Sequence, residues 1–236
     1  AYYEAMKKKR EQLPYDIDGV VYKLNNIETH KQVGTHNKAP RWAIAHKFPP
    51  KAVPTRLLSI HNQVGRTGVI TPVATVDPIE VHGVMVQHAT LHNYAEVKRK
   101  DVRVGDLVLL QRAGDVIPEI VSAVLPERPP NTQAKKPPTH CPSCDTALLQ
   151  STSGIDWHCP AHDRCDAQLK AALIHYAQRD AMDIERLGPG IIDLLWQHAG
   201  VKRFTDLYML TEDALTPLPG MGQKSAHQLI AAIDAS

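Results

Sequence analysis

The four cysteines of this chain fall within one short stretch, with the spacing Cys141-x2-Cys144-x14-Cys159-x5-Cys165. Thiolates at this spacing can surround one Zn²⁺, with the first pair on a tight turn and the second pair beyond a small hairpin. Four protein ligands leave no open position for water or substrate, so we expect the zinc to be structural. Two disulfides are the alternative, but the N-terminus shows no secretory signal, which favours metal binding.

Three histidines lie near these cysteines, namely His140, His158 and His162. The x5 spacing of the second cysteine pair departs from the common x2 spacing, so one of these imidazoles could replace a thiolate. A site of three cysteines and one histidine therefore remains the second option.

Length and charge predict several small modules and a polyanionic partner. The chain has 236 residues, only 5% aromatic residues and 18 prolines, which indicates more than one small domain. Lys and Arg outnumber Asp and Glu by 20 to 13 in residues 1–140, whereas the ratio is 7 to 12 in residues 141–236. The basic part is expected to face a polyanion. No apolar run approaches the roughly 20 residues of a membrane span, so we expect a cytoplasmic protein without membrane contact. We also expect it to be a monomer.

Proline and glycine punctuation divides the chain into four parts. The first part holds two β-like stretches, at residues 17–24 and 42–48. Residues 51–126 contain short Val-, Leu- and Ile-rich runs separated by turns, and a five-stranded oligonucleotide-binding (OB) barrel is the natural candidate. Residues 127–138 have the composition of a Pro- and Lys-rich linker, and the last part, after the cysteines, has apolar residues at helical spacing.

Two glycine-containing turns in the helical part resemble each other across a period of 32 residues. They are Leu187-Gly188-Pro189-Gly190 and Pro219-Gly220-Met221-Gly222. A turn of this kind that opens a helix points backbone N–H groups outward at the positive end of the helix dipole, where a DNA phosphate can bind. This is the helix-hairpin-helix pattern, which grips the DNA backbone without reading its sequence. Plain helix capping is the alternative.

Asp18 and Lys23 belong to one short block, Asp18-Gly19-Val20-Val21-Tyr22-Lys23. They lie an odd number of positions apart, so both can address one site only if the strand bends. Gly19 is expected to supply that conformational freedom. Surface charges on an ordinary strand are the alternative.

Lys47 lies in a second block, Pro40-Arg41-Trp42-Ala43-Ile44-Ala45-His46-Lys47-Phe48-Pro49. We expect it to be buried among Trp42, Ile44 and Phe48. An unpaired ammonium is expensive to bury there, so Lys47 is predicted to meet a phosphate.

These two blocks resemble motifs IV and V of nucleotidyltransferases that adenylate nucleic-acid ends. Further segments extend the resemblance to bacterial NAD⁺-dependent DNA ligase, in the family's order and over essentially the whole chain. The segments are Gln63-Val64-Gly65-Arg66-Thr67-Gly68, Thr71-Pro72-Val73-Ala74, Ala89-Thr90-Leu91-His92-Asn93, Arg112-Ala113-Gly114-Asp115-Val116-Ile117-Pro118, the four cysteines and the glycine turns.

The resemblance implies a multidomain α+β architecture. Its expected parts are the C-terminal piece of an adenylation (nucleotidyltransferase) domain at 1–50, an OB-fold domain at 51–130, a four-cysteine zinc finger at 131–168 and part of an all-α helix-hairpin-helix domain at 169–236. Ligases of this family form a lysyl-AMP from NAD⁺ and pass AMP to the 5′-phosphate at a nick in duplex DNA. The 3′-hydroxyl then displaces AMP, in DNA replication and repair.

The resemblance also assigns roles to residues. Lys23 and Lys47 would contact the nucleotide and its α-phosphate, and Asp18 would help to hold Mg²⁺ (or Mn²⁺) or its water shell. Arg10 and Arg41 resemble arginines that meet phosphates of the cofactor or of the nick. Expected DNA contacts further along the chain are Arg66, Thr67, Arg112, Gly188, Gly190, Gly220 and Gly222. An exposed barrel charge is the alternative for Arg66 and Arg112.

The chain departs from the family at the nucleophile, which lies in a Lys-x-Asp-Gly motif. The single Asp-Gly here, Asp18-Gly19, has Asp16 at the matching position, so the nucleophilic lysine is expected outside this chain. The first ten residues read as the last turns of a helix already under way, so we expect a fragment that cannot adenylate itself. A non-catalytic DNA-binding remnant is the alternative, and an ATP-dependent ligase or capping enzyme would explain neither the cysteines nor the glycine turns.

Overall fold

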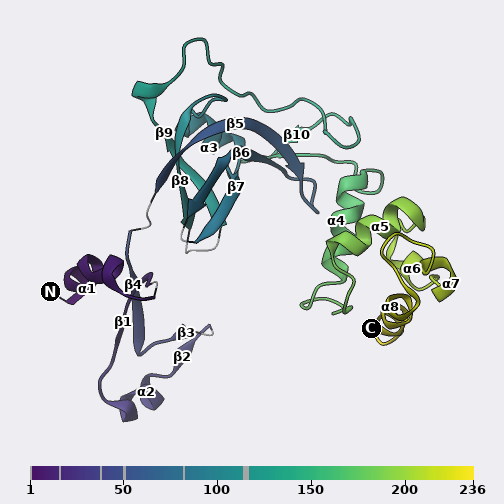
Figure 1. Ribbon diagram of the computed structural model, residues 1–236, viewed down its shortest axis with the longest axis horizontal. Helices are drawn as coiled ribbons and strands as arrows, with labels where there is room; N and C mark the ends of the chain where they lie inside the picture. Colours follow the sequence, from purple (N-terminus) through teal and green to yellow (C-terminus); the bar gives the residue numbers. More distant parts are fainter. Residues whose placement is uncertain (1, 16, 38, 50–51, 82, 114–116) are drawn as a thin grey trace.

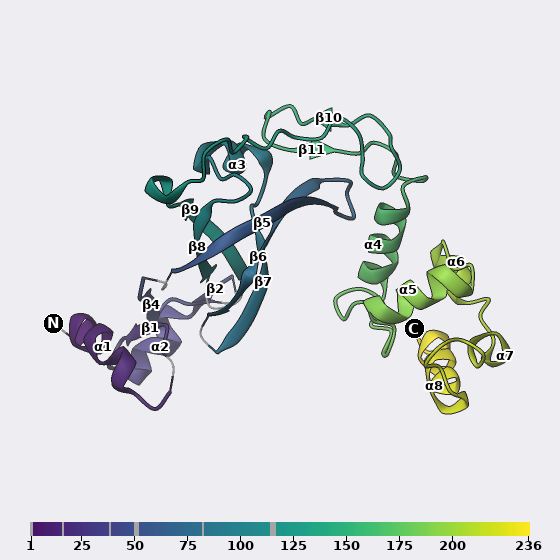
Figure 2. The ribbon, with the colours of Figure 1, turned by 45° about the horizontal axis from the view of Figure 1, so that its top comes forward.

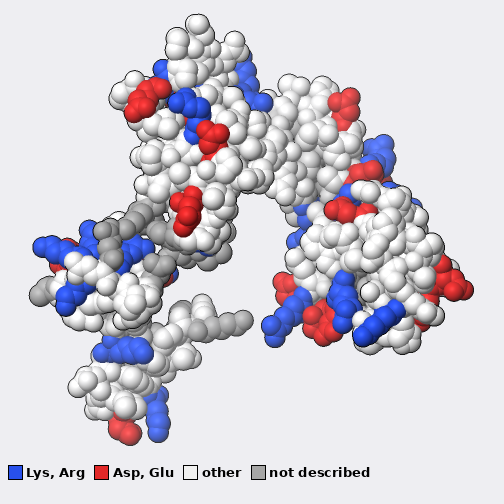
Figure 3. Space-filling view, viewed as in Figure 1, with Lys and Arg blue, Asp and Glu red and all other residues white. Residues whose placement is uncertain are grey.

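The computed structural model describes residues 2–15, 17–37, 39–49, 52–81, 83–113 and 117–236. Three parts follow one another along an arch, from an N-terminal segment through a β-barrel to a group of helices (Figure 1, Figure 2). Figure 3 leaves open space between the N-terminal segment and the helices, and shows Lys and Arg side chains gathered over the N-terminal helix. None of the helices in the described ranges is both long and apolar enough to cross a membrane.

The N-terminal segment is built around a two-stranded antiparallel ladder. Its elements are α1 (Tyr2–Lys9), η1 (Arg10–Gln12), β1 (Gly19–Lys23), α2 (Ile27–Val33), β2 (Thr35–His36), β3 (Ala39–Pro40) and β4 (Ala43–Lys47). β1 pairs with β4, and Gly19 lies opposite Lys47 while Lys23 lies opposite Ala43. Both expected strands are therefore present.

Gly19 has a different function from the expected one. Its φ is not in the left-handed region, so the strand does not depend on the conformational freedom of glycine. Instead, a Cβ at Gly19 would lie 2.5 Å from the carbonyl oxygen of His46 and 2.6 Å from the Cα of Lys47. Glycine is required because β4 passes too close for any side chain.

The middle part is a closed five-stranded barrel with the strand order β5-β6-β7-β9-β8, as expected for an OB fold. Its elements are β5 (Val53–Val64), β6 (Ile70–Val81), β7 (Val84–Thr90), α3 (Tyr94–Lys100), β8 (Leu107–Ala113) and β9 (Ile117–Ala123). Inward-facing apolar side chains such as Leu57, Leu110 and Ile120 are fully buried and form the barrel core. β7 and β9 close the barrel in parallel, at Thr90 and Glu119.

The segment after the barrel is less free than its composition predicts. It starts with η2 (Leu125–Glu127), and Arg128 is then held by two aspartates of the barrel. A short hairpin follows, formed by β10 (Leu149–Gln150) and β11 (Trp157–His158). The linker expected at residues 127–138 is thus attached to the barrel at its beginning.

The C-terminal part is helical and has a core of its own. Its helices are α4 (Asp166–Tyr176), α5 (Pro189–His198), α6 (Phe204–Leu207), α7 (Glu212–Leu215) and α8 (Gln223–Asp234). Buried side chains of this core include Leu173, Ile192, Leu195, Leu215, Leu229 and Ile233. The helical spacing of apolar residues after the cysteines reflects this core.

Candidate functional site

Lys47 and Asp18 form an ion pair at the end of the ladder between β1 and β4. Lys47 Nζ donates to Asp18 Oδ2 at 2.6 Å. The hydrogen bond from Lys47 holds the pKa of Asp18 below its usual value, with a smaller contribution from the charge of Arg10. The structure thus gathers three of the expected phosphate or metal contacts at one place.

The expected burial of Lys47 is wrong. Its side chain is 57% exposed, and Ile44 is 68% exposed, whereas Phe48 is buried. Neighbouring residues of a strand point to opposite faces, so Lys47 faces solvent while Phe48 packs inward. The lysine is paired and accessible.

Lys23 lies at the other end of the same ladder. Residues 19, 21 and 23 of β1 share a face with Lys47, because Gly19 is its direct cross-strand partner. Lys23 Nζ lies 6.0 Å from the ring centroid of Trp42, which stacks on His30 at 4.1 Å. The structure therefore brings Asp18 to Lys47 and places Lys23 farther along the same face.

Two aromatic contacts of the N-terminal helix orient this end of the ladder. Tyr3 stacks on His46 with a centroid distance of 3.8 Å and donates its hydroxyl to the carbonyl of Lys47 at 3.0 Å. The guanidinium of Arg10 lies 5.9 Å from the ring centroid of Phe48. Tyr3 was not predicted, because nothing in its local sequence links it to residues some forty positions away.

Arg41 lies apart from this pair, next to the small hairpin of β2 and β3. Its Nη2 is 3.5 Å from Nδ1 of His36. In the barrel, Arg66 and Thr67 are exposed at the turn between β5 and β6. Arg112, on β8, lines a hollow of about 370 Å³ with the start of β7. The expected Gly114-Asp115-Val116 part of its motif lies outside the described residues, as does Asp16.

The four cysteine thiols form one cluster. Their sulfur atoms all lie within 4.8 Å of one another. The Sγ atoms of Cys141 and Cys165 are 3.9 Å apart, and those of Cys144 and Cys159 are 3.5 Å apart. Sulfurs bound tetrahedrally to zinc at 2.3 Å would be about 3.8 Å apart, so the donor set fits this ion. The four cysteines are free, which argues against the disulfide alternative.

The histidine alternative fits less well. The cluster found among the described residues consists of four cysteines. Nδ1 of His162 lies instead 2.9 Å from Oε1 of Gln168, and His158 forms a β-bridge with Val69. His162 thus contacts a residue next to the cluster and His158 pairs with the turn of the barrel, and neither belongs to the group of thiols.

Two of the thiols have opposite pKa shifts. A hydrogen bond with Thr146 lowers the pKa of Cys144 to about 6, and burial raises the pKa of Cys159 to about 12. A thiolate at Cys144 can accept a hydrogen bond from the thiol of Cys159, since their sulfurs are in contact. A bound cation would favour the thiolate form of both.

The cluster is attached to the tip of the barrel hairpin between β5 and β6. The backbone N–H of Cys159 donates to the carbonyl of Gly68 at 2.9 Å, and Gln168 Nε2 donates to the carbonyl of Cys159 at 3.1 Å. Gly68 has a φ of 82°, and a Cβ there would lie 2.4 Å from that Cys159 carbonyl oxygen. Glycine is therefore required for this contact.

The two glycine turns of the helical part are equivalent at a spacing of 34 residues, so the expected period of 32 is wrong. The N-cap residues are Gly188 for α5 and Gly222 for α8. A left-handed residue, Arg186 or Gly220, precedes each N-cap by two positions. The period of 32 pairs positions that are both glycine in the sequence. In the structure, the positions with the same backbone conformation are 34 residues apart, and Gly190 therefore lies inside α5 instead of at its N-cap.

The comparisons with known proteins agree with this arrangement. Residues 1–51 match the NAD-dependent DNA ligase adenylation domain, and residues 54–132 match the NAD-dependent DNA ligase OB-fold domain. Over the whole chain, the sequence is 48% identical to a DNA ligase of Dichelobacter nodosus, 47% to one of Legionella pneumophila (strain Lens) and 46% to one of Coxiella burnetii (strain Dugway 5J108-111). The chain spans 35% of the length of each of these relatives.

Proposed function

Because this chain belongs to the NAD-dependent DNA ligase family, we propose that it forms the central part of an enzyme that seals nicks in duplex DNA. In this proposal the end of the adenylation domain is residues 1–50, the OB-fold domain is 51–130, the zinc finger is 131–168 and the helix-hairpin-helix part is 169–236. NAD⁺ supplies the adenylate, replication and repair supply the nicks, and the enzyme is a monomer in the cytoplasm.

The observation that carries the proposal is the accessible pair of Lys47 and Asp18. Lys47 is positioned to bind a phosphate, because its ammonium is exposed beside a strand end and is oriented by a carboxylate. Lys23 on the same face extends the positive charge along the ladder. Cations fixed at this edge would stabilise the charge that builds on the equatorial oxygens during displacement at phosphorus.

Asp18 is the residue that could hold Mg²⁺ or Mn²⁺. A divalent cation of this kind keeps several waters and takes one or two carboxylates, and Asp18 is half-exposed and ionised. The ion would neutralise phosphate charge when bound. Arg10 adds a second cation near this carboxylate and is proposed to meet a phosphate of NAD⁺ or of its product.

The helix N-termini of α5 and α8 are proposed to bind the DNA backbone. An added Cβ at Gly188 or Gly222 would meet no atom of the protein within 4 Å, so the space before each helix is open. Backbone N–H groups at such an N-terminus attract phosphate. Further contacts along the duplex would come from Arg66, Thr67, Arg112 and Arg41. Contacts to the DNA backbone do not depend on the base sequence.

Gly222→Ala tests whether the N-terminus of α8 binds the DNA backbone. The variant should keep its thermal stability and bind a nicked duplex about tenfold more weakly, because a methyl group would displace the phosphate from charge-assisted hydrogen bonds. Fluorescence anisotropy with a labelled duplex measures the affinity. Unchanged affinity would favour plain helix capping.

The proposed activity is tested on the full-length protein with a nicked duplex that carries a 5′-phosphate. NAD⁺ should support sealing and release nicotinamide mononucleotide, and ATP should not. Lys47→Ala should abolish sealing, whereas Lys31→Ala, which changes an exposed lysine of α2, should leave it intact. Binding without sealing by the wild type would support the non-catalytic alternative. Residues 1–236 alone should acquire no covalent adenylate from labelled NAD⁺.

A further inference from the structure

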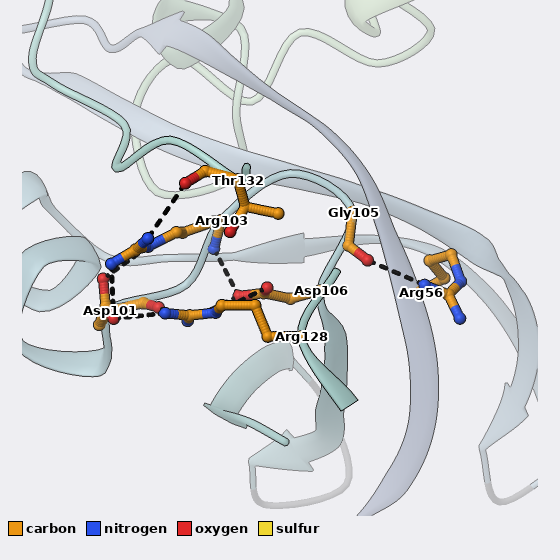
Figure 4. Close-up of polar contacts among 7 residues, drawn as sticks. All are labelled: Arg56, Asp101, Arg103, Gly105, Asp106, Arg128 and Thr132. Atoms are coloured by element: carbon orange, nitrogen blue, oxygen red, sulfur yellow. Dashed lines mark hydrogen bonds and ion pairs between the residues drawn. The ribbon is translucent and has the colours of Figure 1, made fainter. Parts of the chain in front are cut away.

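The segment that leads from the barrel to the cysteine cluster is held at its start by a polar network (Figure 4). The guanidinium of Arg128 lies between two carboxylates, those of Asp101 at the end of α3 and Asp106 just before β8. Nε and Nη2 donate to the two oxygens of Asp106 at 3.0 and 2.9 Å, and Nη1 donates to Asp101 Oδ2 at 2.6 Å. Nη2 also donates to the backbone carbonyl of Asp101.

A second arginine extends this network to the following residues. Arg103 donates to both carboxylate oxygens of Asp101, at 3.0 and 3.1 Å. Its Nη1 donates to the carbonyl of Thr132 at 3.1 Å (Figure 4). Residues 128–137, which we call the strap, are thus fixed to the barrel at two points close to their beginning.

The later part of the strap borders a hollow next to α3. Residues 134–137 line this hollow of about 540 Å³ together with Tyr94 and Val97 of α3 and Trp157 of β11. The hydrogen bonds described above from Arg128 and Arg103 therefore act on the first part of the strap, before this hollow.

The network has the properties of a rigid anchor. The Asp106 side chain is 1% exposed and that of Arg128 is 16% exposed, so water competes weakly for these hydrogen bonds. A planar guanidinium that bonds one carboxylate with two nitrogens fixes direction as well as distance, which an ammonium cannot do.

We infer that Arg128 is a positioning residue that sets the direction in which the chain leaves the barrel toward the cysteine cluster. The cluster itself is attached to the barrel where Cys159 bonds to Gly68 and where His158 forms a β-bridge with Val69, and its buried side chains share a core with those of the barrel. Without Arg128, the hydrogen bond of Arg103 to the carbonyl of Thr132 is left to hold the start of the strap.

The experiment compares Arg128→Met with Arg99→Met in the full-length protein. Arg99 is a matched control, because it also bonds a carboxylate with two nitrogens, that of Glu96, but lies on the exposed side of α3. Loss of Arg128 leaves a buried carboxylate unpaired and can unfold the barrel, so the double variant Asp106→Asn with Arg128→Met is made as well. Arg128→Lys keeps the charge without the two-nitrogen geometry.

Two readouts separate positioning from stability. Hydrogen exchange should rise in the double variant at the amides of positions 127 and 128, which donate to the carbonyls of Val124 and Leu125 at the start of the strap, while the β5 and β6 amides of the barrel stay protected. Because the second readout rests on the proposed function, nick sealing is measured alongside: KM for nicked DNA should rise about tenfold, with adenylation by NAD⁺ unchanged. Arg128→Lys should fall between the wild type and the double variant.

The outcomes distinguish this inference from the proposed function. A wild-type protein that seals no nicks overturns the proposed function, and the exchange measurement still decides the role of Arg128. A double variant that matches Arg99→Met in strap exchange overturns the inference. Increased exchange throughout the barrel does so too, because it would show that Arg128 stabilises the barrel rather than positions the strap.

Discussion

The carboxylate of Asp18 bonds the ammonium of Lys47 across the end of the ladder between β1 and β4, and both side chains are more than half exposed. An ion pair at such a position adds little to the free energy of unfolding, since water screens it. The pair therefore contributes little to the stability of the fold, which fits the phosphate-binding and metal-binding roles proposed for it.

Asp18→Asn should reduce nick sealing by the full-length protein at least about a hundredfold, because Lys47 loses its orienting carboxylate and a bound cation loses a ligand. The melting temperature should stay close to that of the wild type. Single-turnover sealing and thermal unfolding check the two parts. A matched Glu28→Gln variant, which changes an exposed carboxylate of α2, should seal normally.

Cys159→Ser should remove zinc from the protein and unfold the segment around β10 and β11, because metal binding and folding are coupled in so small a module. His162→Ala should keep zinc, since His162 contacts Gln168 and lies outside the thiol cluster. Metal content per chain, measured by mass spectrometry, decides between the two ligand sets. Loss of zinc from the histidine variant would point to a mixed site.

Gly68→Ala should loosen the cluster from the barrel. The new Cβ would collide with the carbonyl of Cys159, and the residue would need a left-handed φ, so we expect a cost of about 1–3 kcal/mol. Gly65→Ala in the same turn is the control, because its Cβ would lie 3.5 Å from its nearest neighbour, an ordinary contact. Chemical denaturation of both variants compares them, and equal stabilities would contradict the argument.

Glu119 gives the barrel a defined response to acid. Hydrogen bonds from Gln111, and then from His92, lower the pKa of Glu119 below its usual value of 4.5. A carboxyl group with a lowered pKa stabilises the fold above its unfolded pKa and loses this effect as the pH falls through its folded pKa. Glu119→Gln should therefore cost about 1 kcal/mol at neutral pH and progressively less below pH 4.5. Denaturation at several pH values tests this, with the exposed Glu80→Gln expected to show no such trend.

The parts of the fold that the sequence predicted are those that depend on local pattern. The β-like composition of residues 17–24 and 42–48 predicted β1 and β4, and the short Val-, Leu- and Ile-rich runs after residue 51 predicted the barrel. The cysteine spacing predicted the thiol cluster, because ligand geometry restricts the chain at both ends of a small hairpin.

The features that the sequence did not reveal depend on contacts between distant segments. The burial expected for Lys47 came from its apolar neighbours, yet strand alternation turned it to solvent. The spacing of the glycine turns needed the conformation of Arg186, a residue type that seldom adopts a left-handed φ. Neither the contact of Tyr3 with His46 nor that of Arg128 with Asp106 leaves a local signal.

The hydrogen bond between Cys159 and Gly68 also bears on how the chain is made. During synthesis the barrel is complete before the last two cysteines leave the ribosome, because all five of its strands precede them. The hairpin tip can then serve as a template on which the late half of the thiol cluster assembles. Metal uptake should accordingly be faster on a folded barrel than on a chain whose barrel is disrupted.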